Sequence, residues 1–179
     1  VLDDIALANV DSKFCAVFDK RIAQNLLSTF ASAISSNTIS KGTTFLKDSL
    51  DKKIFNDQID IIDKANIKKA NGSRYFDSEG VRIEDFKLVK NGILKDYLVE
   101  TYSGKKINRK SNGRSSGTTN LYFENGDQSF EQLINSEKKL LYIKETIGRG
   151  ANIITGDYSV GASGTVSYTH LTLPTKRNV

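Results

Sequence analysis

The residue best suited to metal or acid–base chemistry is His170, the only histidine among 179 residues. Histidine is the commonest metal ligand and a frequent general base, so this side chain bears on which reactions the chain could catalyse. It lies in Thr165–Thr175 (TVSYTHLTLPT), whose reverse translation reads in frame like a transposase-type sequencing adapter. We therefore predict that residues 165–179 are an adapter translation and not native, and that residues 1–164 form a partial domain. The alternative is a native polar strand.

A second candidate is the pair of carboxylates in Tyr75–Arg82 (YFDSEGVR). Asp77 and Glu79 would point to the same face of an extended segment, where they could hold a hard cation or exchange protons. The alternative, which we favour, is a turn that begins at Asp77 and closes at Gly80, with the carboxylate accepting backbone N–H groups.

Basic side chains gather in Ser103–Asn120, a polar stretch that also contains glycine. The cations are Lys105, Lys106, Arg109, Lys110 and Arg114. Such a cluster could neutralise phosphates, but recognition of single strands usually adds stacking aromatics. Ile107 is the only large apolar residue between these cations. We therefore expect a solvated surface loop and disfavour a nucleic-acid site.

Other nucleophilic chemistry is poorly supported. Cys15 is the only cysteine, and its apolar neighbours predict a buried strand residue. Without His170 the chain has no histidine for a Ser/His/Asp triad or a His/Cys zinc site. Gly148–Gly150 and Gly161–Gly164 lack the lysine and the strand-to-helix context of a phosphate-binding loop. We expect tight turns there.

The composition, with 38% hydrophobic and 26% charged residues, is that of an ordinary soluble protein. The formal charge of +5 includes Lys176 and Arg177, so residues 1–164 hold 24 basic and 21 acidic residues, a net +3. That excess is too small to imply nucleic acid on its own. No apolar run approaches the roughly 20 residues of a membrane helix, so we expect one domain and no membrane span. The chain starts without methionine or a signal pattern, and we expect a fragment at both ends.

Local patterns predict the elements that position these residues. The apolar run Lys13–Phe18 is typical of a strand, and an amphipathic helix over residues 20–35 follows it, with Asp19 as N-cap. β-Branched residues in Ile54–Ile62 favour a further strand.

The next prediction is a hairpin, because Asn91-Gly92 separates the apolar segments Phe86–Lys90 and Ile93–Thr101 and both turn residues need positive φ. Leu121–Glu124 and Leu140–Thr146 are expected strands. Ser129–Ile134 is an expected helix with a capping box. Together these patterns predict an α+β fold with a mainly antiparallel sheet and a few helices.

Five collinear blocks carry a family resemblance. They are Thr43–Leu50 (TTFLKDSL), Phe76–Arg82 (FDSEGVR), Asn91–Leu94 (NGIL), Ser129–Leu133 (SFEQL) and Ile154–Ser159 with Gly161–Gly164 (ITGDYS, GASG). In these blocks the chain resembles the C-terminal domain of the TldD/PmbA family, on its PmbA (TldE) side.

The resemblance implies a cytoplasmic proteolytic system in which a TldD-like zinc subunit pairs with a PmbA/TldE-type subunit and acts on small or unfolded peptides. In that family zinc is held by an HExxxH helix of the TldD-like partner, and no HExxxH occurs here. The resemblance therefore implies no zinc and no catalytic residue in this chain. Its expected work is to bind the partner and the peptide, with extended peptide added to a sheet edge.

In the family, a loop corresponding to Ser111–Asn120 lies near the cleft, and Asn112, Arg114 and Asn120 are our candidates for partner or peptide contact. Ser111–Arg114 (SNGR) departs from the family's usual S-T-G-H or S-T-G-N. Two alternatives stay open. One is a binding module for nucleic acid or DNA gyrase that uses the basic stretch 103–120, since the family also bears the name modulator of DNA gyrase. The other is an independent peptidase with a metal on Asp77, Glu79 and Asp157.

Overall fold

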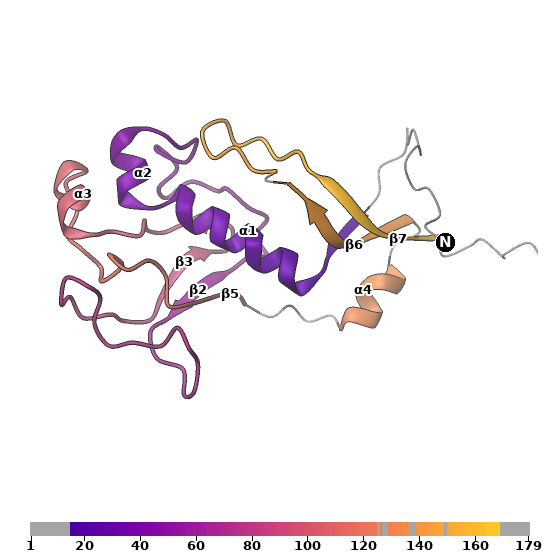
Figure 1. Cartoon of the computed structure of the whole chain (residues 1–179), viewed down its shortest axis with the longest axis horizontal. Helices are drawn as coiled ribbons and strands as arrows, with labels where there is room; N and C mark the ends of the chain where they lie inside the picture. The colour runs from indigo at the N-terminus through magenta and orange to yellow at the C-terminus, as the bar shows by residue number, and fades with distance from the viewer. Residues whose placement is uncertain (1–14, 125, 127–128, 137–138, 149, 169–179) are drawn as a thin grey trace, which may run out of the picture.

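Two sheets and four helices make up the computed structural model, which describes residues 15–124, 126, 129–136, 139–148 and 150–168 (Figure 1). One sheet has the order β1-β6-β7 and the other the order β4-β3-β2-β5. The strands are β1 (Cys15–Phe18), β2 (Ile61–Lys64), β3 (Phe86–Lys90), β4 (Ile93–Leu94), β5 (Asn120–Phe123), β6 (Lys139–Ile147) and β7 (Gly161–Tyr168). The helices are α1 (Lys20–Ala33), α2 (Ser36–Lys41), α3 (Thr101–Lys106) and α4 (Phe130–Ser136). Only the β1–β6 pairing is parallel among these strands, which confirms the predicted α+β fold with mainly antiparallel pairing.

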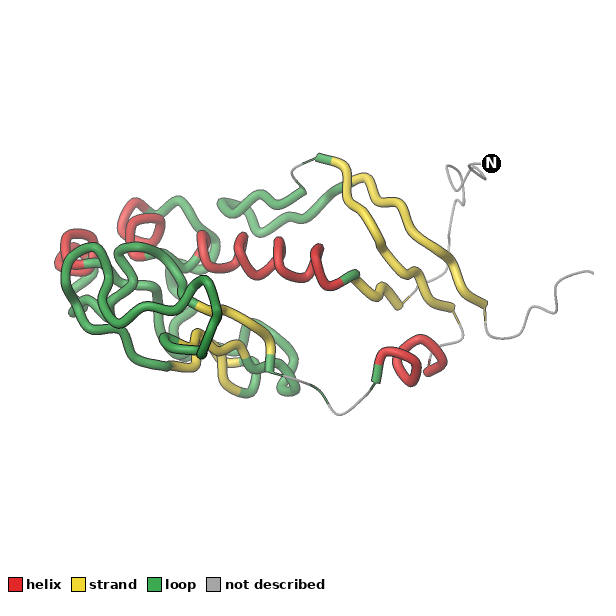
Figure 2. The backbone as a smooth tube through the Cα atoms, turned by 60° about the horizontal axis from the view of Figure 1, so that its bottom comes forward, coloured by secondary structure: helices red, strands yellow, loops and turns green. Residues whose placement is uncertain are grey.

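Helix α1 lies between the two sheets (Figure 2). It begins where predicted, because the Asp19 carboxylate accepts the Arg21 N–H at 3.0 Å. The Tyr142 hydroxyl donates to the same carboxylate at 2.9 Å and so joins the start of α1 to β6. Burial of Leu27 and Ala33 directs the apolar side of α1 into the core.

The main core lies between α1, α2 and the four-stranded sheet. Its buried members are Leu27, Ala33, Ile34, Ile39, Leu46, Ile61, Leu88, Val89, Leu94, Tyr97, Leu98 and Val99. Strands β2 and β3 supply its floor, and the segment after β4 supplies one side. Burial of these side chains is the principal stabilising contribution, at roughly 1.5–3 kcal/mol for each large aliphatic residue.

The predicted hairpin is confirmed at its turn, where Asn91 and Gly92 have φ values of 49° and 72°. Its second strand is much shorter than predicted, since β4 ends at Leu94. The chain then leaves the sheet and pairs with the junction of α1 and α2, where the Leu98 N–H donates to the Ile34 carbonyl at 3.0 Å. The apolar run that predicted a long strand is thus buried against helices.

Two other predictions were wrong in detail. β2 starts at Ile61, not at Ile54, because the Asn56 side chain accepts the Gln58 N–H at 3.1 Å and forms a turn that interrupts the run. Cys15 lies on β1 as predicted but is exposed, since it begins an edge strand whose burial starts only at Val17.

The tight turn expected at Gly161–Gly164 is wrong, because these residues begin β7 and pair with β6. The other later elements agree with the prediction. β5 and β6 fall on the two expected strands. Ser129 and Gln132 form the predicted capping box, with each backbone N–H bound to the other's side chain at 2.8 and 3.2 Å. None of the helices in the described part of the chain is long and apolar enough to cross a membrane.

Candidate functional site

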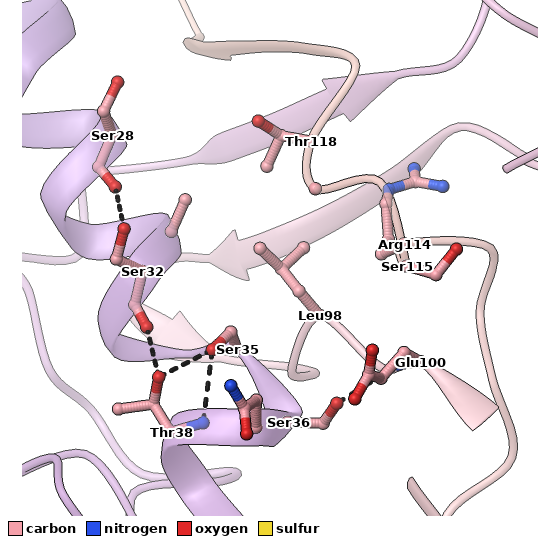
Figure 3. A pocket seen from close by; sticks show the side chains of 13 residues that line it. Ser28, Ser32, Ser35, Ser36, Thr38, Leu98, Glu100, Arg114, Ser115 and Thr118 are labelled. Atoms are coloured by element: carbon pink, nitrogen blue, oxygen red, sulfur yellow. Dashed lines mark hydrogen bonds between the residues drawn. The ribbon is translucent and has the colours of Figure 1, made fainter. Parts of the chain in front are cut away.

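A cleft opens between α1, α2 and the loop that precedes β5 (Figure 3). Its volume is about 540 Å³. It is lined by Ser28, Ala31, Ser32, Ser35, Ser36, Asn37, Thr38, Leu98, Glu100, Arg114, Ser115, Gly117 and Thr118. We refer to these thirteen residues as the hydroxyl cleft, because seven of them are serine or threonine.

The helical wall of the hydroxyl cleft is a chain of hydroxyl groups on α1 and α2. Ser28 and Ser32 stand one turn apart, and each donates to the carbonyl four residues before it at 3.0 Å. Thr38 donates to the Ser32 carbonyl at 3.0 Å. Ser35 is the N-cap of α2 and accepts the Thr38 N–H at 3.3 Å. The wall is therefore held by hydrogen bonds within the two helices.

The base of the cleft is a second hydrogen-bonded set that joins α2 to α3. The Ser36 and Ser103 hydroxyl oxygens lie 2.6 Å apart, and both residues are buried. Ser103 donates to the Glu100 carboxylate at 2.7 Å, and the Glu100 N–H donates to Ser36 at 3.2 Å. These contacts fix the position of the Glu100 carboxylate beside the cleft.

The opposite wall is held by a buried ion pair. Arg114 Nε donates to the Asp63 carboxylate on β2 at 2.6 Å, and neither side chain has any exposed surface. The carboxylate also accepts the Thr119 N–H and hydroxyl, each at 2.9 Å. Burial lowers the pKa of the Arg114 guanidinium, and Asp63 opposes that shift. A further bond to the Glu84 carbonyl, at 2.9 Å, completes a rigid support behind Ser115 and Thr118.

Asn112 and Asn120, the other two predicted contact residues, also have internal partners. Asn112 accepts the Val99 N–H at 2.9 Å and donates to the Tyr97 carbonyl at 2.8 Å. Asn120 donates to the Lys64 carbonyl at 2.8 Å. The structure brings Asn112 and Arg114 together in the loop that walls the cleft. Contact of these three residues with a partner or a peptide remains a prediction.

The carboxylates of the second candidate form the turn that we favoured. Asp77 accepts the N–H groups of Glu79 and Val81, both at 2.9 Å, and Gly80 closes the turn with φ of 73°. Asp77 also accepts the Ser115 N–H at 3.2 Å, so this turn braces the cleft wall.

The alternative metal site on Asp77, Glu79 and Asp157 is wrong. No group of three or more His, Cys, Asp or Glu residues in the described ranges could hold a metal ion. Glu79 instead accepts the N–H and hydroxyl of Thr101 at 2.9 and 2.8 Å. His170 lies outside the described residues.

The basic stretch does not form one uniform solvated loop, because α3 occupies its start and Arg114 is buried. Arg109 pairs with Asp96 at 2.6 Å, and both side chains are about one-third exposed. Lys106 lies 4.4 Å from the ring centre of Tyr102, which is 68% exposed. An aromatic side chain therefore does accompany the cations, although it precedes the stretch in the sequence.

Comparison with known proteins identifies the family. The sequence model of the PmbA/TldA metallopeptidase C-terminal domain matches residues 11–170. The metalloprotease PmbA homolog of Buchnera aphidicola subsp. Baizongia pistaciae is 40% identical over 153 residues, which cover 85% of this chain and 34% of that protein. The chain belongs to the PmbA/TldA metallopeptidase C-terminal domain family. Both the matched range and strand β7 extend beyond residue 164, where the native sequence was predicted to end. The adapter origin of residues 165–179 stays a prediction.

Solved structures of the PmbA/TldA type share the fold. A candidate modulator of DNA gyrase from Bacteroides thetaiotaomicron has a TM-score of 0.82 at 31% identity and covers 88% of this chain and 36% of that one. TldE from Thermococcus kodakarensis has a TM-score of 0.59 at 24% identity, covers 69% of this chain and 31% of that one, and is alike in fold. The chain spans about a third of the length of the curated relatives it matches.

Zinc, which the family name implies, does not suit the hydroxyl cleft of this PmbA/TldA domain. Protein zinc sites use thiolate, imidazole and carboxylate ligands, whereas the cleft offers one carboxylate, Glu100, among hydroxyl groups. The arrangement can bind a ligand through hydrogen bonds and charge, and we derive no metal-dependent step from it.

Sequence reasoning did not find the cleft. Ser28 and Ser32 recur at a spacing of four residues, which places them on one face of α1, and Ser35 follows three residues later as the N-cap of α2. That stripe resembles a solvated helix face, and its role depends on Glu100 and Ser115, which are remote in sequence. The spacing of these serines was the sequence feature that could have indicated the cleft.

Proposed function

We propose that this chain is the peptide- and partner-binding domain of a PmbA/TldE-type subunit in a cytoplasmic metallopeptidase system. The zinc and the hydrolytic chemistry belong, in this proposal, to a TldD-like partner, and the substrates are small or unfolded peptides. The observation that carries the proposal is the hydroxyl cleft: a hydrogen-bonding cavity with rigid walls in a domain of the PmbA/TldA family.

The cleft suits a peptide because its polar groups are held in place before a ligand arrives. Asp63 and Asp77 anchor one wall from behind, and hydrogen bonds within α1 and α2 hold the other. A site fixed in this way spends little binding free energy on ordering its own side chains. Its volume, about 540 Å³, lies within the range of small-molecule sites.

The test is co-purification of the full-length protein with a TldD-like protein, followed by peptide cleavage with each subunit alone and with both. We expect a stable complex, with cleavage that requires the TldD-like subunit and increases when this subunit is present. Stoichiometric zinc in the isolated full-length protein, together with peptide cleavage without a partner, would contradict the proposal.

A second candidate function is binding of nucleic acid, or of a protein bound to it, through the basic stretch 103–120. The observation in its favour is Lys106 beside the exposed ring of Tyr102, because cations next to an exposed aromatic side chain suit a single-stranded nucleic acid. Salt separates the two candidates: phosphate neutralisation predicts an affinity that falls steeply with salt, and hydrogen bonding to a peptide backbone predicts a weaker dependence.

A further inference from the structure

The hydroxyl groups of the helical wall have no hydrogen left to offer a ligand. Ser28 and Ser32 donate to carbonyl groups inside α1, and Thr38 donates to the Ser32 carbonyl. Thr38 has a single hydroxyl hydrogen, so in its 2.7 Å contact with Ser35 the donor must be Ser35. Figure 3 draws the hydrogen bonds of Ser32, Ser35 and Thr38. What the wall can still offer a ligand is therefore oxygen lone pairs.

The donors can be assigned in the same way at the base of the cleft. Ser103 donates its hydrogen to Glu100 at 2.7 Å, so Ser36 is the donor in the 2.6 Å contact with Ser103. The Glu100 carboxylate accepts hydrogen bonds and donates none. Five cleft hydroxyl groups and one carboxylate are thus acceptors toward any ligand, while Asn37, Ser115 and Thr118 can still act as donors.

The charges of the cleft lining also favour a ligand that donates hydrogen bonds. Glu100 and Arg114 are the two ionisable residues of the lining. The Arg114 guanidinium is fully buried against the Asp63 carboxylate, so its charge is compensated inside the protein. Glu100 lines the cleft and takes part in none of the ion pairs found in the described residues, so no cationic side chain pairs with it there.

We infer that the hydroxyl cleft recognises a cationic nitrogen of a peptide, an ammonium or guanidinium group, with Glu100 as its counter-charge. An ammonium group offers three hydrogens and no acceptor, which complements a wall of lone pairs beside a carboxylate. Carboxylates and phosphates would meet like charge and too few donors. This inference rests on the proposed peptide-binding function and specifies which part of the peptide enters the cleft.

Two sources of this cation are possible in a peptide, its α-ammonium terminus and a lysine or arginine side chain. One short peptide of alanine and glutamine with a fluorophore at its C-terminus serves as the probe, in three forms. The first has a free N-terminus, the second is N-acetylated, and the third is N-acetylated and carries one internal lysine. Binding to the full-length protein is measured by fluorescence anisotropy.

We expect the acetylated peptide without lysine to bind about ten- to a hundredfold more weakly than a charged form, the usual range for a hydrogen bond to a charged group. Tighter binding of the first form assigns the terminus, and tighter binding of the third assigns a side chain. Glu100→Gln keeps an oxygen for Ser103 and should remove most of the difference. Glu145→Gln, an exposed residue of β6 outside the cleft, should leave it unchanged.

Equal affinity of all three peptides for the unmodified protein would overturn the inference while leaving peptide binding, and so the proposed function, in place. Failure of every peptide to bind would overturn both. Because the acetylation comparison needs no variant, a Glu100→Gln protein that does not fold leaves the test decisive.

Discussion

The two halves of the stretch 103–120 differ in charge and in environment, although each contains an arginine that forms an ion pair. Residues 103–110 include the end of α3 and three exposed lysines, whereas residues 111–120 carry side chains that bind the core. Arg109, in the first half, pairs with a partner that is about one-third exposed, and Arg114, in the second, pairs with one that is fully buried. The difference shows that the burial of the acceptor decides whether an arginine stays partly exposed or supports a site from inside the protein.

The buried acceptor is Asp63, an inward-facing carboxylate on β2. It binds Arg114 and Thr119, which lie 51 and 56 residues further along the chain. Asp77 adds a bond to Ser115, and these contacts together place the second half against the hydroxyl cleft. A cleft wall made of loop residues can therefore be as fixed as one made of a helix.

Replacement of Arg114 should produce the largest difference between the halves. Arg114→Met leaves the Asp63 carboxylate buried without its counter-charge, and we expect a loss of about 3–5 kcal/mol in the free energy of unfolding. The matched change Arg109→Met breaks a partly exposed pair and should cost roughly 0–1 kcal/mol. Urea unfolding followed by circular dichroism measures both.

A double variant controls for the loss of arginine packing on Phe86, whose ring centre lies 4.8 Å from the guanidinium. Asp63→Leu combined with Arg114→Met removes both charges, and part of the stability should return. Equal losses for Arg109→Met and Arg114→Met would mean that the two halves do not differ as described.

This contrast also marks what the sequence could reveal. The Asn91-Gly92 turn, the Asp19 cap and the Ser129 capping box were predicted correctly, because each depends on residues within a few positions of one another. The burial of Arg114 and the contact of Ser36 with Ser103 join residues 51 and 67 positions apart. No local pattern encodes such pairs, so the fold class was predictable and the cleft was not.

Two glycines of the second half should separate close packing from backbone strain. Gly113 and Gly117 both have positive φ, at 75° and 79°. A Cβ at Gly113 would lie 2.7 Å from the Arg82 carbonyl oxygen, whereas a Cβ at Gly117 would meet nothing within 4 Å. We expect Gly117→Ala to cost about 1 kcal/mol from strain, and Gly113→Ala roughly 1–3 kcal/mol more from the clash. Thermal unfolding compares them, and equal costs would show that the second half can move away from Arg82.

Acid should loosen the second half through Asp77. Burial alone would raise the pKa of this carboxyl, but hydrogen bonds from Ser115, Val81 and Glu79 outweigh it and hold the pKa below its ordinary value of 3.8. Because the folded-state pKa is the lower one, the stabilisation is fully present above 3.8 and is lost as the pH falls through the folded-state value. Asp77→Asn should cost about 1–2 kcal/mol near neutral pH. The difference in the free energy of unfolding between this variant and the unmodified protein should narrow in acid. A constant difference would argue against the view that the turn supports Ser115.

The smallest effect on stability is expected in the first half. A triple change of Lys105, Lys106 and Lys110 to glutamine removes three exposed charges, and the free energy of unfolding should change by no more than about 0.5 kcal/mol. The same variant also distinguishes peptide binding from nucleic-acid binding, since a nucleic acid would contact these three cations. If the peptide proposal is right, peptide affinity and its dependence on Glu100 stay unchanged in the triple variant. The contrary result would be that the triple variant binds single-stranded DNA more weakly than the unmodified protein and with a flatter dependence on salt. Residues 103–110 would then have a binding role of their own, separate from the support that residues 111–120 give to the cleft.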